Sequence, residues 1–173
     1  MAYCAACDGM RYKGKTVVVA GGGNSAAADA LYLSKICEKV YLVHRRDRLR
    51  ASRVYYDALK KSGVEILFDS RVVGLESDKV LTGVAIEDVV KGGRRDIPCA
   101  ALFVAVGRQP ETDLVKGQLA LDENGYITAD ETTKTSIEGV FAVGDVRAKP
   151  LRQIVTAAAD GATCSRFLEE FLK

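Results

Sequence analysis

The sequence predicts an α/β fold whose first part is a doubly wound, mostly parallel sheet. Three observations support this prediction. Strand and helix patterns alternate from about residue 15 to 70, a glycine-rich turn joins the first strand to the first helix, and a more evenly alternating stretch follows. Strands buried on both faces of a parallel sheet are continuous apolar runs, whereas antiparallel strands with one solvated face alternate apolar and polar residues. The 173 residues are enough for one large core or two small ones.

The alternating region contains three expected strands and two expected helices. Residues 16–20 form a β-branched run, and residues 40–43 and 64–68 are further short apolar runs. Residues 24–34 are rich in Ala and Leu at helical spacing, and residues 51–62 predict a second helix that the next glycine closes. This βαβαβ order is half of a doubly wound sheet.

The next stretch predicts a small antiparallel excursion from the parallel sheet. Residues 72–77, 80–89 and 95–98 alternate evenly, and Asp78 and two later glycines mark the turns between them. Residues 101–106 then return to a buried strand.

The remainder of the chain is less regular. Residues 107–110 break the pattern and predict a crossover between domains. A polar, hairpin-like region, a short strand at 139–142 and a turn at 144–145 come next, and residues 153–172 predict a final helix. Its residues expected near one face are Ile154, Ala157, Ala158, Ser165, Leu168 and Leu172.

Composition excludes several classes of protein. With 48% hydrophobic and 28% charged residues, the chain has an ordinary globular composition. A net charge of +2 does not by itself imply a nucleic-acid partner. No stretch approaches the roughly 18 apolar residues of a membrane span, and no signal peptide follows Met1. We therefore expect a cytoplasmic protein with no membrane partner.

The glycine-rich turn predicts a dinucleotide-binding site. Gly21 permits a tight turn, Gly23 lets the backbone approach a pyrophosphate, and the small Ala26 lets the helix pack on the strand. The helix N-terminus offers free N–H donors to the phosphates. The candidate cofactor-binding residues here are Gly21, Gly23, Asn24, Ser25 and Ala26.

A basic segment after the second strand indicates the cofactor. An NAD site has an acid here for the ribose 2′-hydroxyl, whereas this chain has Arg45, Arg46 and Arg50. Guanidinium groups bind a 2′-phosphate by charge-assisted hydrogen bonds, which predicts NADPH over NADH. His44 is expected to pack near the adenosine, and Asp47 to do no more than orient the arginines. The alternatives are a solvated basic helix start or a nucleic-acid patch.

Cys4 and Cys7 predict a redox-active dithiol. Their spacing lets one turn of backbone bring the two sulfurs within bonding distance, and Asp8 could donate a proton to a leaving thiolate. A zinc site would need further ligands, and the chain has one histidine and no second CxxC, so we predict no metal. The remaining alternative is two unrelated thiols. The other cysteines, expected to be inert apolar residues, are Cys37, Cys99 and Cys164.

These motifs together resemble those of the low-molecular-weight, bacterial-type thioredoxin reductases. The CAxCDG loop at 4–9, the GGGNSA turn at 21–26 and the HRRDxxRA segment at 44–51 match that family, as do later stretches around 104–110, 139–146 and 152–153. The flavoprotein partner of alkyl hydroperoxide reductase has a similar loop but an acidic residue in place of the arginines. The related ferredoxin–NADP reductases lack the dithiol.

The resemblance implies a Rossmann-like NADP-binding domain plus the C-terminal part of an FAD-binding domain. Residues 1–103 would form the NADPH-binding domain with the redox CxxC, and residues 104–173 a C-terminal segment of a split FAD-binding domain. Asp145 would bind the flavin ribityl chain, and Arg152 and Gln153 would lie near the isoalloxazine. Two motif glycines, Gly107 and Gly144, complete the implied cofactor-binding set.

The implied activity passes electrons from NADPH to FAD, then to the disulfide of Cys4 and Cys7, and finally to thioredoxin. The family is homodimeric. The N-terminal FAD segment of the family is missing, so we expect a fragment that is inactive by itself. The alternative is an NADP-binding module with a redox dithiol but no flavin-dependent catalysis.

Overall fold

The computed structural model describes residues 1–173 and divides into two compact units. The first comprises Met1–Gly107 and the second Arg108–Lys173. The division falls at the predicted crossover segment 107–110. The predicted domain boundary between residues 103 and 104 instead lies inside a continuous strand, because β7 (Ala101–Ala105) pairs along its length with β1.

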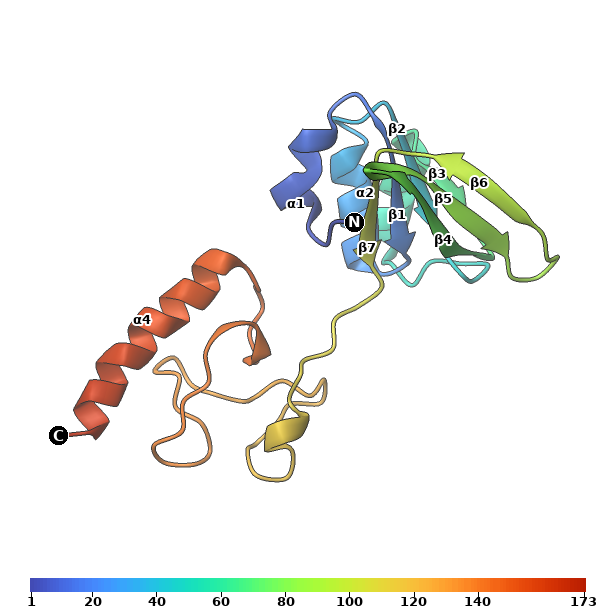
Figure 1. Cartoon of the computed structure of the whole chain (residues 1–173). Coiled ribbons are helices and arrows are strands. Elements are labelled where there is room, and N and C mark those ends of the chain that lie inside the picture. Colours follow the sequence, from blue (N-terminus) through green and yellow to red (C-terminus); the bar gives the residue numbers. More distant parts are fainter. The chain divides into compact units, whose positions relative to one another are not determined.

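The first unit is built on a four-stranded parallel sheet (Figure 1). In spatial order its strands are β3 (Glu65–Leu67), β2 (Lys39–Val43), β1 (Thr16–Gly21) and β7. The centre of β1 is fully buried, with Val17 and Val19 in one core cluster and Val18 in another. The β-branched run therefore predicted this central strand correctly. Burying each such side chain contributes about 1.5–3 kcal/mol to stability.

Helices cover one face of the parallel sheet (Figure 1). They are α1 (Ala5–Asp8), the 3₁₀ turn η1 (Gly9–Tyr12), α2 (Asn24–Leu33) and α3 (Arg53–Lys61). The helix α2 contributes small residues to the core, Ala26, Ala27 and Ala30, which let it approach β1 closely. Gly63 follows α3 with a φ of +75°, the left-handed conformation expected of a glycine after a helix.

A three-stranded antiparallel sheet covers the opposite face, in agreement with the predicted excursion (Figure 1). Its strands are β4 (Ser70–Asp78), β5 (Val80–Asp88) and β6 (Arg94–Pro98). Val84 and Ile86 on β5 pack with Val18 and Leu102 of the parallel sheet. The first unit therefore has three layers, helices, parallel sheet and antiparallel sheet.

The second unit is mostly irregular. It contains two 3₁₀ turns and one helix, which are η2 (Asp113–Val115), η3 (Gly144–Val146) and α4 (Ile154–Phe171). The predicted strand at 139–142 is wrong: one isolated bridge joins Lys134 and Phe141. The backbone there bonds only across one narrow loop, so no ladder extends beyond that bridge.

The helix α4 buries only Asp160 fully, and several of its apolar side chains face solvent. Ile154 is 90% exposed and Leu172 is 74% exposed, so the expected apolar face is not covered within this unit. Phe171 meets Phe141 edge to face, with ring centroids 6.5 Å apart. No helix in the structure combines the length and apolarity that crossing a bilayer requires.

Candidate redox and nucleotide-binding site

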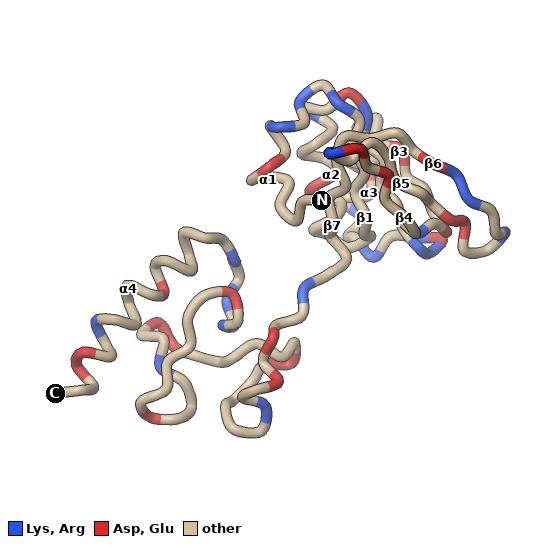
Figure 2. The backbone as a smooth tube through the Cα atoms, viewed as in Figure 1, with Lys and Arg blue, Asp and Glu red and all other residues tan.

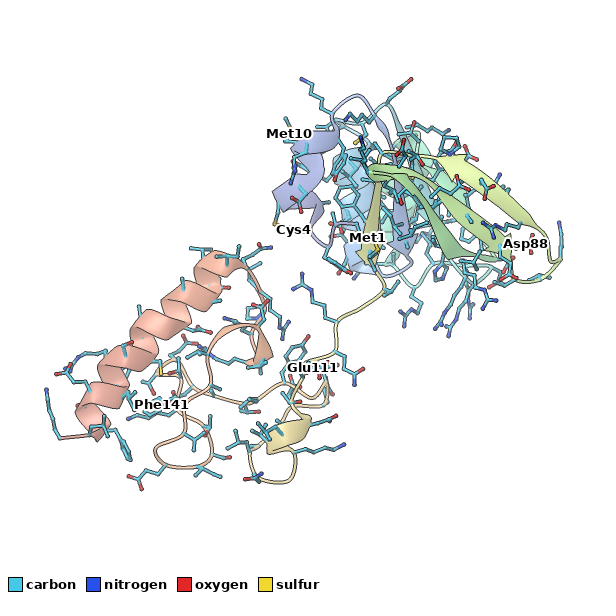
Figure 3. All side chains as sticks on the ribbon, viewed as in Figure 1. Met1, Cys4, Met10, Asp88, Glu111 and Phe141 are labelled. Atoms are coloured by element: carbon cyan, nitrogen blue, oxygen red, sulfur yellow. A yellow bond between two sulfur atoms is a disulfide. The ribbon has the colours of Figure 1, made fainter.

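Cys4 and Cys7 form a disulfide across α1, and their Cα atoms are 5.3 Å apart. Cys4 is the N-cap of this short helix, and its sulfur accepts a hydrogen bond from the Cys7 amide at 3.1 Å. Cys4 is half-buried and Cys7 is exposed. Figure 3 shows Cys4 and Met10 on the segment that carries α1. The expected disulfide is confirmed, and Cys7 is the more accessible of the two residues that form it.

Close packing fixes the position of this disulfide on the helical layer. Ala5, inside the CxxC loop, is 1% exposed and belongs to the core that includes α2. A Cβ added at Gly9 would come within 2.9 Å of the Tyr32 ring on α2. Tyr12 packs edge-on against Phe103 of β7, with centroids 5.7 Å apart. The redox loop is therefore held against the helix that starts at the nucleotide turn.

The three remaining cysteines are free thiols, as expected. Burial raises the pKa of Cys37, and burial raises the pKa of Cys99 to about 11. Thiolate is the reactive form, so neither residue is suited to exchange at neutral pH. Asp8, the predicted proton donor, forms a 3.7 Å ion pair with Arg11.

The glycine-rich turn leads from β1 into α2 as predicted. A Cβ on Gly21 would collide with the Ala105 carbonyl oxygen and with Ala26, so glycine is needed there for packing. A Cβ on Gly23 would meet no protein atom, and its φ of −92° is open to any residue. The protein itself does not require glycine at Gly23, which is consistent with space kept for a ligand. No side chain caps α2, so its first amides remain available to an anion.

Gly22 is a site residue that sequence reasoning missed. A Cβ there would overlap the imidazole of His44, so the middle glycine gives this ring its place. The Gly22 carbonyl also accepts hydrogen bonds from the amides of Arg50 and Ala51, at 2.7 and 3.1 Å. One residue thus ties the phosphate turn to the basic segment. The only local signal was a third glycine in a motif that needs two.

Asn24 and Ser25 begin α2 with exposed side chains. The Asn24 Oδ1 accepts a hydrogen bond from the Ser52 amide at 2.8 Å. This bond and those to Gly22 occupy the amides of residues 50–52. Ser52 has an extended backbone, with a φ of −61° and a ψ of 157°, so α3 begins at Arg53 rather than at residue 51. Asn24 therefore links two loops, and its amide nitrogen remains available for a ligand.

The basic segment follows β2 at the carboxyl end of the sheet (Figure 2). Arg45, Arg46 and Arg50 are exposed and form no ion pair, which leaves their guanidinium groups available to an anion. The predicted role of Asp47 in orienting them is not seen, because Asp47 forms no ion pair. His44 is 6% exposed. Burial lowers its pKa, and the charges of Arg50 and Arg46 lower it further, so the ring is neutral at pH 7.

A cleft of about 670 Å³ is lined by part of the glycine-rich turn and part of the basic segment. It lies between the carboxyl ends of β1, β2 and β7 and the first half of β4. One end is cationic because of Arg45, Arg50 and Arg71, and it also includes the neutral ring of His44. The rest is mainly apolar, with Val104 and Val106 among its lining residues. Arg46 and Gly23 do not line this cleft. Of the remaining predicted residues, Gly107 is exposed with a φ of +116° at the end of the unit.

The predicted flavin contacts of the second unit lie around the start of α4. Gly144 begins η3 with a φ of +77°, and Asp145 beside it is exposed. The Arg152 guanidinium stacks on Tyr126, 3.6 Å from the ring centroid. Gln153 caps α4 through a reciprocal capping box with Thr156. Asp145, Arg152 and Gln153 thus belong to the two segments that meet where η3 packs on α4.

Asp160, which sequence reasoning also missed, holds those two segments together. Its carboxylate accepts hydrogen bonds from the Gly144 amide at 2.9 Å, Arg147 at 2.9 Å and Lys149 at 2.5 Å. Burial alone would raise the pKa of Asp160, but the bonds from Lys149 and the Gly144 amide outweigh burial and lower it. All three charged side chains are about nine-tenths buried, so this cluster anchors α4 to the turn that carries Asp145.

A disulfide beside a strand–glycine turn–helix defines a class of protein. Residues 1–161 match the family model described as pyridine nucleotide-disulphide oxidoreductase, and the chain belongs to this family. Among its relatives are the thioredoxin reductase of Rickettsia felis and thioredoxin reductase 2 of Arabidopsis thaliana. Each is 44% identical over 98% of this chain, which spans 56% and 46% of their respective lengths.

Solved structures agree with this assignment. The crystal structure of thioredoxin reductase from Streptococcus pyogenes superposes with a TM-score of 0.91 at 40% identity, over 98% of this chain and 56% of that one. Thioredoxin reductase from Giardia duodenalis gives a TM-score of 0.85 at 41% identity, over 99% and 57%. The predicted resemblance and fold class are confirmed, and the chain spans about half the length of these relatives.

Proposed function

We propose that this chain carries the redox dithiol and the NADPH site of a thioredoxin-disulfide reductase. One observation carries the proposal: the Cys4–Cys7 disulfide is packed on α2, the helix whose N-terminus forms the dinucleotide turn. The relatives are named thioredoxin reductases, which points to thioredoxin or a similar protein as the disulfide substrate. A single disulfide beside three free thiols fits a reducing compartment such as the cytoplasm.

NADPH is the proposed reductant. The open first turn of α2 would bind the pyrophosphate, and Arg45, Arg46 and Arg50 would bind the 2′-phosphate. His44, neutral and seated on Gly22, would pack beside the adenosine. Gly107, which follows β7 at the carboxyl edge, would border the nicotinamide end. The nicotinamide and a flavin supply the hydride and electron-pair chemistry, and the protein supplies position and charge.

FAD is the second proposed cofactor. Gly144 and Asp145 would approach the ribityl chain, and Arg152 and Gln153 the isoalloxazine. These residues fit a flavin edge in two respects: the Arg152 guanidinium lies over the Tyr126 ring, and the Asp160 carboxylate accepts a hydrogen bond from Gly144 of η3. They do not include a second glycine-rich phosphate turn.

The chemistry of the dithiol follows from exposure. Two electrons and two protons convert the Cys4–Cys7 disulfide to two thiols. The Cys7 thiolate, which belongs to the more exposed residue, attacks the partner disulfide and forms a mixed disulfide while one partner sulfur leaves as a thiolate. Cys4 then attacks the Cys7 sulfur, restores the internal disulfide and releases the second partner thiolate. Asp8 would supply a proton to a leaving thiolate.

Trapping the mixed disulfide tests this function. The reduced Cys4→Ser variant keeps Cys7 but lacks the resolving thiol, so it should accumulate a covalent adduct with oxidised thioredoxin. The Cys7→Ser variant should yield much less adduct, and Cys164→Ser should behave as the unmodified chain. Non-reducing electrophoresis with mass mapping identifies the bridged residues. No adduct with Cys4→Ser, or an adduct through Cys37 or Cys99, would refute the proposal.

A further inference from the structure

The cationic end of the cleft contains a guanidinium group that lies outside the basic segment. Arg71 is near the start of β4, more than twenty residues beyond Arg45 in the sequence, yet both line the same cleft with Arg50. One backbone hydrogen bond explains the placement, because β4 begins at Ser70, whose amide donates to the His44 carbonyl at 2.9 Å. Two separate segments therefore bring three arginines to one cavity.

A neighbouring carboxylate holds Arg71 in a defined orientation. Arg71 lies opposite Glu87 in the register of β4 and β5, and its Nε lies 2.6 Å from the Glu87 Oε2. A guanidinium has five N–H donors in a planar fork, so this contact uses one edge and leaves N–H groups on Nη1 and Nη2 for another acceptor. Glu87 does not line the cleft, whereas Arg71 does.

We propose that Arg71 is a further specificity-determining residue that binds the ribose 2′-phosphate of NADP(H), with Glu87 as the residue that positions it. The inference rests on the proposed function, in which Arg45, Arg46 and Arg50 bind that same phosphate. A phosphate dianion presents three oxygens in different directions, so a guanidinium group on a second segment can bind the phosphate from a side other than that of the basic segment. Arg71 reaches the phosphate from the β4 side of the cleft.

Stability does not account for this arrangement. Arg71 is 61% exposed and Glu87 is 36% exposed, and such a surface pair typically contributes 1 kcal/mol or less. Removing Arg71 should therefore leave the fold intact, and nucleotide binding can be measured without a folding defect. The matched control is Arg94, which is 62% exposed, forms an ion pair with Asp96 in the same sheet and does not line this cleft.

Isothermal titration of the 173-residue chain with NADP⁺ and with NAD⁺, at fixed ionic strength, tests the inference. Arg71→Ala should raise the Kd for NADP⁺ about tenfold. This loss of affinity is near the lower end of what one charge-assisted hydrogen bond contributes, because water competes for the guanidinium at this exposed site. The Kd for NAD⁺ should change less than about twofold. Arg71→Lys should retain part of the preference, because it keeps the charge but loses the fork. Arg94→Ala should change neither affinity.

A double variant separates this inference from the proposed function. Arg45→Ala/Arg46→Ala should narrow the preference for NADP⁺ by about tenfold or more. If the unmodified chain binds both nucleotides equally, the proposed cofactor and the role of Arg71 both fail. Suppose instead that Arg45→Ala/Arg46→Ala narrows the preference for NADP⁺. If Arg71→Ala then weakens the binding of NADP⁺ and NAD⁺ equally, or changes the binding of neither, only the role of Arg71 is overturned.

Discussion

The most informative residues at the smallest scale are the three consecutive glycines, because an added Cβ would have a different effect at each one. Gly21 is required by the backbone of β7, Gly22 by the ring of His44, and Gly23 by no protein atom. The sequence motif treats Gly21 and Gly23 as the functional pair. The structure adds that Gly22 is where the phosphate turn and the basic segment are joined.

Substitutions at two of these glycines should both weaken nucleotide binding but should differ in their effect on stability. Gly22→Ala forces His44 out of place, so the free energy of unfolding should fall by about 1–3 kcal/mol and nucleotide binding should weaken. Gly23→Ala should leave the unfolding free energy nearly unchanged and still weaken nucleotide binding, because the added methyl would enter the space kept for pyrophosphate. Urea denaturation and calorimetric titration measure the two effects. A large loss of stability in Gly23→Ala would contradict this account.

His44 should make stability depend on pH. Its folded pKa is lowered by burial below the ordinary value of 6.5, so the unfolded chain binds a proton more readily. The unfolding free energy should therefore be highest above pH 6.5 and fall as the pH drops below it, by at most about 1.4 kcal/mol per pH unit. His44→Gln should remove this dependence between pH 6.5 and 5. Denaturant titrations at pH 7.5, 6 and 5 provide the comparison, and identical slopes for both proteins would refute it.

At the scale of elements, the turn η3 and the helix α4 are joined by a buried charge cluster rather than by an apolar core. The Asp160 carboxylate accepts hydrogen bonds from one backbone amide and from two cationic side chains. The apolar residues of α4 that normally fix a helix are instead largely exposed. The position of α4 within the second unit therefore depends strongly on one carboxylate.

Removing that carboxylate should loosen α4. Asp160→Ala leaves Arg147 and Lys149 without their buried partner, and breaking a buried pair in this way costs about 3–5 kcal/mol. Hydrogen exchange should show lost protection in α4 and unchanged protection in β1 and β2. Glu169→Ala, which removes an exposed ion pair between α4 and Lys173 just beyond its end, is the control and should change little. Equal protection in Asp160→Ala and Glu169→Ala would show that the cluster is not the anchor.

At the scale of the whole molecule, the two units differ in the binding features that each contains by itself. The first unit contains a complete strand–turn–helix with its basic segment and a disulfide. The second contributes a turn and a helix start, with no phosphate-binding turn of its own.

A polypeptide limited to these 173 residues should therefore bind NADP(H) but retain little FAD. The ADP half of FAD needs a phosphate-cradling turn, and the single one in this sequence is the turn assigned to NADPH. After incubation with FAD and gel filtration, the absorbance near 450 nm should be far below one flavin per chain, and NADPH should not drive thioredoxin reduction above background. A yellow protein whose turnover disappears in Cys4→Ser would contradict this expectation.

The sequence by itself determined the parallel sheet, the antiparallel excursion, the nucleotide turn and the cysteine pair. These features depend on near neighbours: a β-branched run, a glycine spacing and a two-residue gap each restrict the local backbone directly. The same kind of reasoning failed at residues 139–142, where the run forms one bridge, because residues 133–135 are the one segment of the unit that pairs with it.

Only the tertiary structure decided how these parts meet. Gly22 contacts His44, and Asp160 bonds Gly144 and Arg147, although the residues of each pair are 13 or more positions apart. Arg71 and Arg45, also far apart in sequence, line one cleft. No local propensity encodes such a contact, since each residue alone is compatible with many neighbours. The motifs thus specified the chemistry, and the packing of β1, β2 and β4 specified which side chains share the cleft.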